Sequence, residues 1–297
     1  QYLSSEKYKD LISKSGEFST FKNFKIFPIN LGSFNKPTQN TKLLDSSSSS
    51  EEKTFILDKP NLYILELNPT NEKNYKFIFN ENKAKLIIEG KVLKKNKFNF
   101  VGNVDVSEKT IVRDGEQIRF DNNLLTGCVT FLNTEFKGGY IFSQNLKCED
   151  AVNIINSNGR IDNVEILDSR YDALDIDSSN ISIKKLHVMK AGNDCADFSF
   201  GNYEILESSI NNCSDKAFSF GESSQGSIIN SLIKNSSNAI AAKDNSVVKV
   251  QNSKALEIRD YCLAAYNKKP EFEGAEIIKS NFVCVGESLK DSKSSIK

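Results

Sequence analysis

From Asp150 onward a short sequence pattern recurs about every 22 residues, and this repeat restricts the possible folds more than any other feature of the chain. Each copy places polar residues before a small residue and an alternating apolar pair. The copies are Glu149–Ile154, Tyr171–Ile176, Asn193–Phe198, Ser214–Ser219, Ser237–Ala242 and Asp260–Ala265. A fixed period of this length is typical of a solenoid, in which each unit buries its apolar side chains only against its neighbours.

Apolar residues alternate within each copy, as they do in a half-buried strand. The pairs expected to point inward are Val152/Ile154, Leu174/Ile176, Ala196/Phe198 and Ile240/Ala242. A second apolar cluster follows each copy after a polar break, for example Ile161, Val164 and Ile166, or Ile228, Ile229, Leu232 and Ile233. Asn, Ser, Gly and Asp fill the breaks, which suits tight corners between strands.

Two other repeat architectures fit the pattern less well. A helical interpretation is disfavoured because few segments keep a 3.6-residue period for more than about ten residues and β-branched residues dominate the interior. The dense leucine spacing of leucine-rich repeats is absent. We therefore predict an all-β fold, a single-stranded right-handed parallel β-helix with coils of about 22 residues.

Composition divides the chain into four regions. Residues 1–52 form an N-terminal extension that ends in the serine run Ser46–Ser50, which we expect to be a linker. Residues 53–125 hold strand-like runs and are interpreted either as the first coils or as a β-rich cap over the open end of the helix. Residues 126–286 form the parallel β-helix. Residues 287–297 are rich in Ser and Lys and are expected to be a flexible tail.

The overall composition points to an exported protein without a membrane span. Lys plus Arg and Asp plus Glu both number 39, so no net charge attracts nucleic acid or anionic lipid. No apolar run approaches the roughly 18 to 20 residues that cross a bilayer. The chain begins at Gln1 without a leader, which fits a mature chain whose targeting segment has been removed. We therefore expect a secreted or cell-surface protein.

Cysteine spacing matches the repeat. The pairs Cys128/Cys148, Cys195/Cys213 and Cys262/Cys284 are separated by 20, 18 and 22 residues, which is close to one coil. The first and third pairs are expected to stack on successive coils about 5 Å apart, as disulfides or as a ladder of free thiols. The second pair is expected to meet across a turn. Zinc is disfavoured because the single histidine, His187, has no close Cys partner.

Stacking the copies aligns polar side chains in two columns. One column is Asp150, Asp172, Asp194, Asp215 and Asn238, and the other is Asn153, Asp175, Asp197, Phe218 and Ala241. Because side chains two apart in a strand share a face, Asp175 and Asp177 point the same way, with Asp197 one coil above. Carboxylates within about 5 to 8 Å raise at least one pKa and thus supply an acid beside a base. Lys216 and Lys243 on the following coils offset this charge.

Several of these runs resemble known motifs. Asp172–Ile176, followed by Gly192–Ala196, is similar to the polygalacturonase family of glycoside hydrolases, with its Asn-Thr-Asp-Gly and Gly-Asp-Asp-Cys motifs. Lys216–Gly221 resembles that family's Gly-His-Gly-Leu-Ser-Ile-Gly, and Ala241–Lys243 its Arg-Ile-Lys. The resemblance, within the pectate-lyase-like superfamily of right-handed β-helices, covers Asp150 to Pro270. It implies general acid and base roles for Asp172 and Asp194 and binding of a uronate carboxylate by Lys243.

The chain departs from that pattern at three positions. Asn193 replaces an aspartate, Lys216 stands where histidine is expected, and Ala241 stands where arginine is expected. Hydrolysis needs two carboxyl groups that flank the bond, and Asp194 with Asp172 or Asp175 still supplies them. A lyase needs a base and a cation, which Lys216 or Lys243 can supply. The resemblance to pectate-lyase-like proteins also implies possible calcium binding by clustered aspartates.

Two functional hypotheses follow. The first is a carbohydrate-active enzyme, a hydrolase or lyase of an acidic polysaccharide, whose catalytic candidates are Asp172, Asp175, Asp194, Asp197 and Lys216. Its substrate-binding candidates are Asp177, Lys243, Tyr266 and Lys268, the last two either as a sugar-stacking shelf or as an ordinary edge of the solenoid. The second hypothesis is a non-catalytic adhesion protein that binds glycan or serves as a structural platform. In it, the aspartates only hold the coil corners. Both leave the oligomeric state open.

Overall fold

The computed structural model describes residues 19–21, 24–26, 41–45, 51–70, 72–103 and 125–297. It is an all-β structure whose parallel strands stack as a solenoid of about 10 turns with a spacing of about 23 residues. This confirms the predicted β-helix class of fold. The chain divides into two units, residues 1–41 and 42–297. In the first, β1 (Ser19–Phe21) and β2 (Phe24–Ile26) form an antiparallel hairpin; the second is the solenoid.

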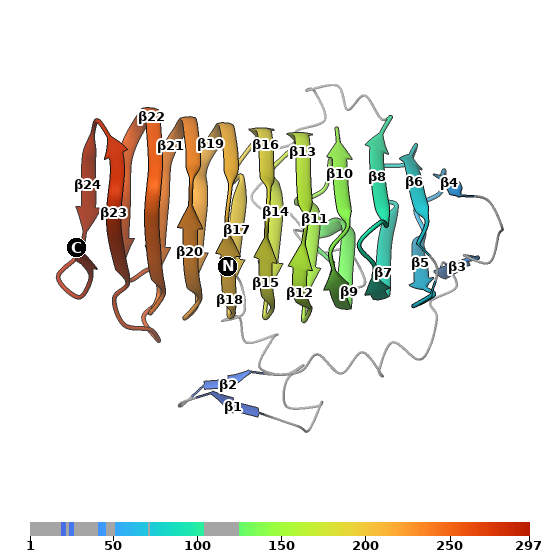
Figure 1. Ribbon diagram of the computed structural model, residues 1–297, viewed down its shortest axis with the longest axis horizontal. Coiled ribbons are helices and arrows are strands. Elements are labelled where there is room, and N and C mark those ends of the chain that lie inside the picture. The colour runs from blue at the N-terminus through green and yellow to red at the C-terminus, as the bar shows by residue number, and fades with distance from the viewer. Residues whose placement is uncertain (1–18, 22–23, 27–40, 46–50, 71, 104–124) are drawn as a thin grey trace. The chain divides into compact units, whose positions relative to one another are not determined.

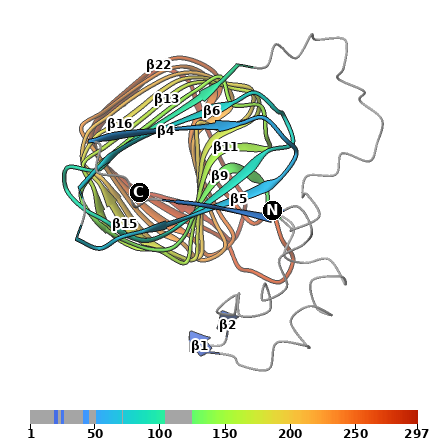
Figure 2. The ribbon, with the colours of Figure 1, turned by 90° about the vertical axis from the view of Figure 1, so that its right-hand side faces the viewer.

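The parallel pairings group the strands of the solenoid into three faces, which run along its length (Figures 1 and 2). The first face pairs β5, β7, β9, β11, β14, β17 and the later parts of β19, β21 and β22 in parallel. Its strands are β3 (Thr41–Leu44), β5 (Leu62–Leu67), β7 (Lys85–Val92), β9 (Gly127–Lys137), β11 (Asp150–Ile155), β14 (Asp172–Asp177), β17 (Ala196–Ser199), β19 (Ser208–Gly221), β21 (Ser231–Lys243), β22 (Val247–Tyr266) and β24 (Glu287–Lys290).

The other two faces complete each coil. The second face contains β12 (Asn158–Ile161), β15 (Asn180–Ile183), β18 (Asn202–Ile205), β20 (Gln225–Ile229), the start of β22, β23 (Glu276–Cys284) and β25 (Ser295–Ile296). The third face contains β4 (Glu52–Leu57), β6 (Asn74–Phe79), β8 (Lys97–Gly102), β10 (Tyr140–Gln144), β13 (Asn163–Ser169), β16 (Leu186–Ala191), the earlier parts of β19 and β21, the middle of β22 and the end of β23.

The core fills the space between the faces, as the alternation predicts. All of the predicted inward pairs are fully buried, from Val152 and Ile154 to Ile240 and Ala242. Aromatic rings also stack from coil to coil, with Phe77 and Phe100 5.3 Å apart and Phe198 and Phe220 4.7 Å apart between ring centroids. One member of the second apolar clusters faces solvent, since Leu232 is 37% exposed. It points outward because its neighbours Ser231 and Ile233 take the inward positions of β21.

Asparagine and serine build the corners. Asn133 and Asn156 adopt the left-handed conformation with φ of 50° and 48°, and the Asn156 amide donates to the Asn133 carbonyl oxygen at 2.7 Å. The Ser157 hydroxyl accepts the backbone N–H of Thr134, and the Ser179 hydroxyl accepts that of Ser157, each at 2.9 Å. These short polar side chains therefore satisfy backbone groups that the corners take out of the ladder.

Three disulfides join neighbouring coils at the predicted pairs: Cys128–Cys148, Cys195–Cys213 and Cys262–Cys284. Their Cα atoms lie 5.3, 5.5 and 6.0 Å apart, within the usual range for a disulfide. The disulfide alternative to a free-thiol ladder therefore holds for all six cysteines. Such bridges are compatible with a protein that folds in an oxidising compartment.

The regions at both ends of the solenoid differ in part from the sequence-based division. Strands β4 to β8 pair in parallel with the coils that follow, so the described part of residues 53–125 forms first coils rather than a separate cap. Residues 287–297 are not a loose tail: β24 and β25 continue the parallel pairing with β22 and β23. The Ser294 hydroxyl accepts the backbone N–H of Ala275 and helps to hold this end in place. The serine run Ser46–Ser50 lies outside the described residues.

Candidate functional site

The first face carries the predicted acidic side chains on its outer surface. Asp175 is in register with Asp197, and Asp177 with Ser199, so the carboxylates of β14 and β17 occupy neighbouring coils. Lys243, at the end of β21, is in register with Tyr266 of β22. We call the outward side chains of β11, β14 and β17 and of the paired parts of β19, β21 and β22 the acidic face.

The column alignment is correct except at one coil. Asp197 pairs with Ser219, and Lys216 pairs with Asn238, so Lys216 and Ser219 occupy the places predicted for Asp215 and Phe218. Phe218 instead points inward and is fully buried. The cause is an irregularity in β19 between Cys213 and Lys216, which changes the register against β21 by one residue. A count of 22 residues onward from Asp194 and from Asp197 identifies Lys216 and Ser219 from the sequence.

Asp172 and Asp194 form a ladder with the backbone. The Asp172 carboxylate accepts the N–H of Asp194 at 2.8 Å, and the Asp194 carboxylate accepts the N–H of Lys216 at 2.9 Å. The Lys216 ammonium lies 3.3 Å from the same Asp194 oxygen and also pairs with Asp215. Asp194 is completely buried, and its second oxygen has no hydrogen-bond partner. This geometry gives Asp172 and Asp194 a role in holding the corner.

Asp175, Asp177 and Asp197 project from the strands themselves. The Asn153 amide donates to Asp175 at 3.1 Å and to Asp150 at 3.3 Å, which links β11 with β14. The Lys243 ammonium lies 3.9 Å from the Asp197 carboxylate, across the coil that contains Ser219. The structure therefore brings these three carboxylates and Lys243 together in one cluster rather than dispersing them into separate turns.

Burial and mutual repulsion change the protonation of this cluster. Burial raises the pKa of Asp177 to about 7 and that of Asp194 to about 6. The pKa of Asp175 lies well above its usual value because of burial and the nearby charge of Asp177. Burial alone would lower the pKa of Lys243, but Asp197 and Asp194 raise it above its usual value. The face therefore combines protonated carboxyl groups with a charged lysine near neutral pH.

Three residues extend the cluster beyond the sequence-based candidates. The Ser199 hydroxyl donates to Glu222 at 2.7 Å, and the Lys269 ammonium pairs with the other Glu222 oxygen. Glu222 sits in a corner after β19 with a φ of 49°, which is unusual for glutamate. No repeat motif marks Glu222 or Lys269, so their positions follow only from the folded corners.

The predicted sugar-stacking shelf is only partly assembled. Tyr266 is half-buried beside Lys243, whereas Lys268 is exposed in the loop that follows. Asp244 anchors that loop by accepting the backbone N–H groups of Lys268 and Lys269 at 2.6 and 2.8 Å. Phe272, in the same loop, packs against Phe200 with ring centroids 6.4 Å apart and is buried.

In the described residues, the side chains that most often ligate metals do not gather around one point. Within this part of the chain, no three His, Cys, Asp or Glu side chains converge in a way that could hold a metal ion. The acidic residues instead point along the coils toward Asn153, Lys216 and Lys243. No helix of the described residues has the length and apolar character to cross a membrane.

Comparison with protein-family models, curated proteins and solved structures finds no match to this chain. The likeness to polygalacturonases therefore depends on the motif residues alone. The solenoid fold itself rests on the strand pairing described above.

Proposed function

We propose that the acidic face is a carbohydrate-active site that hydrolyses an acidic polysaccharide in an exported protein. One observation carries the proposal: Asp175, Asp177 and Asp197 occupy adjacent coils, with Lys243 3.9 Å from Asp197. Asp177 and Asp197 are diagonal neighbours, a relation that separates side chains by about 7 to 8 Å. That spacing suits an acid and a base that admit a water between them, as in inverting hydrolysis.

Each residue has a distinct role in this proposal. Asp177, with its pKa raised to about 7, donates a proton to the leaving-group oxygen. Asp197, ion-paired with Lys243, accepts a proton from the attacking water. Tyr266 and Lys243 lie beside this pair and suit a uronate ring and its carboxylate. The three disulfides are typical of an exported protein.

A lyase mechanism has weaker support. It needs a base beside the carbon from which a proton is removed, and Lys216 and Lys243 are the predicted candidates. Neighbouring aspartates raise the pKa of both lysines although burial opposes this, so both remain protonated at neutral pH. They can neutralise a uronate carboxylate but cannot take the proton.

A second function, non-catalytic glycan binding, is favoured by the burial of the same cluster. Lys243 is only 2% exposed and Asp197 only 7% exposed, which limits the access of a polymer to the acid and the base. Asp172 and Asp194 also hold the corner through their hydrogen bonds, which explains the presence of these two aspartates without a catalytic role. On this alternative, the face is a rigid platform.

Incubation with uronate-containing and neutral polysaccharides tests the proposal. We expect new reducing ends without the ultraviolet absorbance of unsaturated sugars, and a rate reduction of about 100-fold or more in Asp177→Asn and Asp197→Asn. Glu204→Gln, which removes an exposed carboxylate on the second face, should leave the rate unchanged. Absorbance of unsaturated products would establish a lyase instead. Binding without cleavage would establish the platform alternative.

A further inference from the structure

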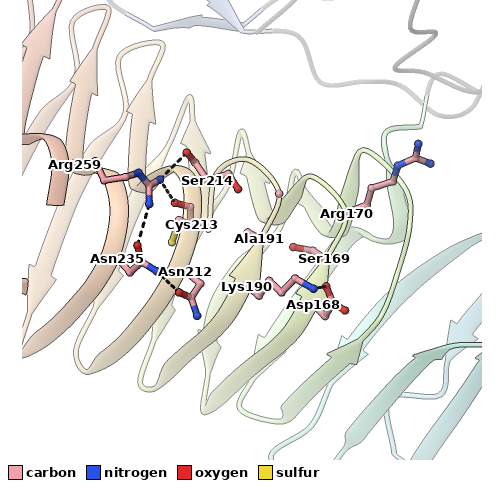
Figure 3. Close-up of a pocket in the computed structure, with 11 residues that line it drawn as sticks. Asp168, Ser169, Arg170, Lys190, Ala191, Asn212, Cys213, Ser214, Asn235 and Arg259 are labelled. Atoms are coloured by element: carbon pink, nitrogen blue, oxygen red, sulfur yellow. Dashed lines mark hydrogen bonds and ion pairs between the residues drawn. The ribbon is translucent and has the colours of Figure 1, made fainter. Parts of the chain in front are cut away.

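A pocket of about 450 Å³ lies along the corner that leads from the third face to the first (Figure 3). Successive coils contribute to its lining through Asp168–Arg170, Lys190–Gly192, Asn212–Ser214, Asn235 and Arg259. Figure 3 shows Arg259 toward one end and Asp168 with Lys190 toward the other. None of the residues assigned a role in hydrolysis lines this pocket.

Arg259 is fixed in place by uncharged acceptors. Its guanidinium donates to the backbone carbonyls of Cys213 and Ser214, each at 3.1 Å, and to the Asn235 side chain at 3.0 Å. The side chain thereby reaches back over two coils and holds one orientation. Because these acceptors carry no charge, they orient the guanidinium without neutralising it.

The opposite end of the pocket also has more positive than negative charge. Lys190 forms an ion pair with Asp168 at 3.0 Å, and Lys147 approaches the same carboxylate at 4.0 Å. Among the lining residues, Arg170, Lys190 and Arg259 are cationic and Asp168 is anionic, a difference of two positive charges. A concave site with such an excess attracts anions.

Lys190 occupies a backbone position that disfavours lysine. It has a φ of 69°, and the equivalent corner residues of neighbouring coils are Asn145, Asp168, Asn212 and Asn235, with φ between 50° and 60°. Asn and Asp tolerate this left-handed conformation, whereas lysine does so at a cost. Glu257 continues the column with a φ of 56° but does not line the pocket. A strained residue that also supplies charge to a pocket suggests a functional reason.

We propose that this corner pocket binds the anionic group of a ligand, a carboxylate, sulfate or phosphate, between Arg259 and Lys190. The fixed guanidinium orients the anion, and the exposed lysine contributes charge from the other end. The proposal does not depend on hydrolysis by the acidic face. It requires only that the solenoid be folded.

Titration by NMR tests the site, with amide signals of Ala191, Gly192 and Ser214 as reporters at constant ionic strength. The probes are sodium sulfate, sodium phosphate, galacturonate and, as an uncharged control, glucose. We expect saturable shifts with the anions and none with glucose. In Lys190→Asn the affinity should fall about tenfold, as expected for loss of one charge-assisted contact. The matched control is Lys185→Asn, an exposed lysine paired with Glu207 at 3.8 Å, which should bind normally.

The outcome also identifies the source of the anion. Tighter binding of sulfate or phosphate than of galacturonate would support a free inorganic anion, and the reverse order would support an acidic sugar. The proposal fails if no anion gives saturable shifts at these amides, or if Lys190→Asn and Lys185→Asn bind equally well. Asp177→Asn and Asp197→Asn, which test hydrolysis, should leave these shifts unchanged.

Discussion

At the scale of single residues, one of the left-handed corner positions holds a residue type that this backbone conformation disfavours. Lys190 has a φ of 69° in a column where Asn212 and Asn235 pair through their side chains. We expect Lys190→Asn to raise the free energy of unfolding by about 0.5 to 1 kcal/mol, because asparagine adopts this conformation at less cost. This gain is the part of the roughly 1 to 2 kcal/mol cost of the left-handed conformation that remains after the loss of the exposed ion pair with Asp168, which contributes less than about 1 kcal/mol.

Urea unfolding of the folded chain measures this difference. Lys185→Asn is again the control, since it removes an exposed lysine that does not have a positive φ. A lower unfolding free energy for Lys190→Asn than for the unaltered chain would contradict the argument. Together with the anion titration, this variant separates the two roles of Lys190, because it should gain stability while it loses affinity.

The candidate site could be predicted residue by residue only where the strands are regular. Asp175, Asp177 and Asp197 follow from alternation and the repeat, and the structure aligns them as expected. Lys216 takes the place predicted for Asp215 because the strands keep the 22-residue spacing from Asp194, whereas the prediction aligned the column by its aspartates. Glu222 approaches Ser199 through a corner, so only the folded chain brings it to the site.

At the scale of elements, the disulfides act on pairs of coils. Cys262–Cys284 joins β22 to the end of β23, the last long strand of the described solenoid. In solenoids each coil is stabilised mainly by its neighbours, so an end coil can open separately. A crosslink that closes a loop of this length contributes about 3 kcal/mol.

We therefore expect the double variant Cys262→Ala/Cys284→Ala to open locally rather than to unfold throughout. Hydrogen exchange of β23 amides such as Ile277 should become roughly 100-fold faster, which corresponds to about 3 kcal/mol. Amides of β14 and β17 should exchange at the original rate and serve as the internal control. Equal acceleration along the whole solenoid would show that the coils open together.

The sequence predicts most elements between Asp150 and Tyr266 because polar corners separate them regularly. The earlier coils carry a weaker signal. Their strands β6 and β8 are dominated by aromatic residues such as Phe77 and Phe100, which stack on one another but do not mark corners. The sequence therefore left coil and cap as alternatives there, and the parallel pairing of β6 with β8 decides for coils.

At the scale of the whole solenoid, the acidic face links several coils electrostatically. Burial raises the pKa of Asp177 to about 7 and of Asp194 to about 6, and it raises the pKa of Asp172 and Asp175 as well. In the unfolded chain these groups titrate near 3.8. Between these values the folded protein binds more protons than the unfolded chain, so its free energy of unfolding falls as the pH rises.

Other groups do not reverse this dependence in the same window. Neighbouring carboxylates raise the pKa of Lys216 and Lys243 although burial opposes this, so these lysines lose their stabilising effect only above about pH 10.5. Hydrogen bonds lower the pKa of Glu276 and Asp291, whose stabilising contribution is complete above about pH 4.5. The net effect between pH 4.5 and 7 is therefore set by the buried aspartates.

We expect the free energy of unfolding to decrease by at least about 1 kcal/mol between pH 4.5 and 7, since one unit of pKa difference corresponds to about 1.4 kcal/mol. Urea unfolding at several pH values measures the slope. Asp177→Asn should make it shallower, because asparagine does not titrate, whereas Glu204→Gln should leave it unchanged. A stability that rises over this interval would mean that the carboxylates are ionised in the folded protein, and the acid role of Asp177 would then be untenable.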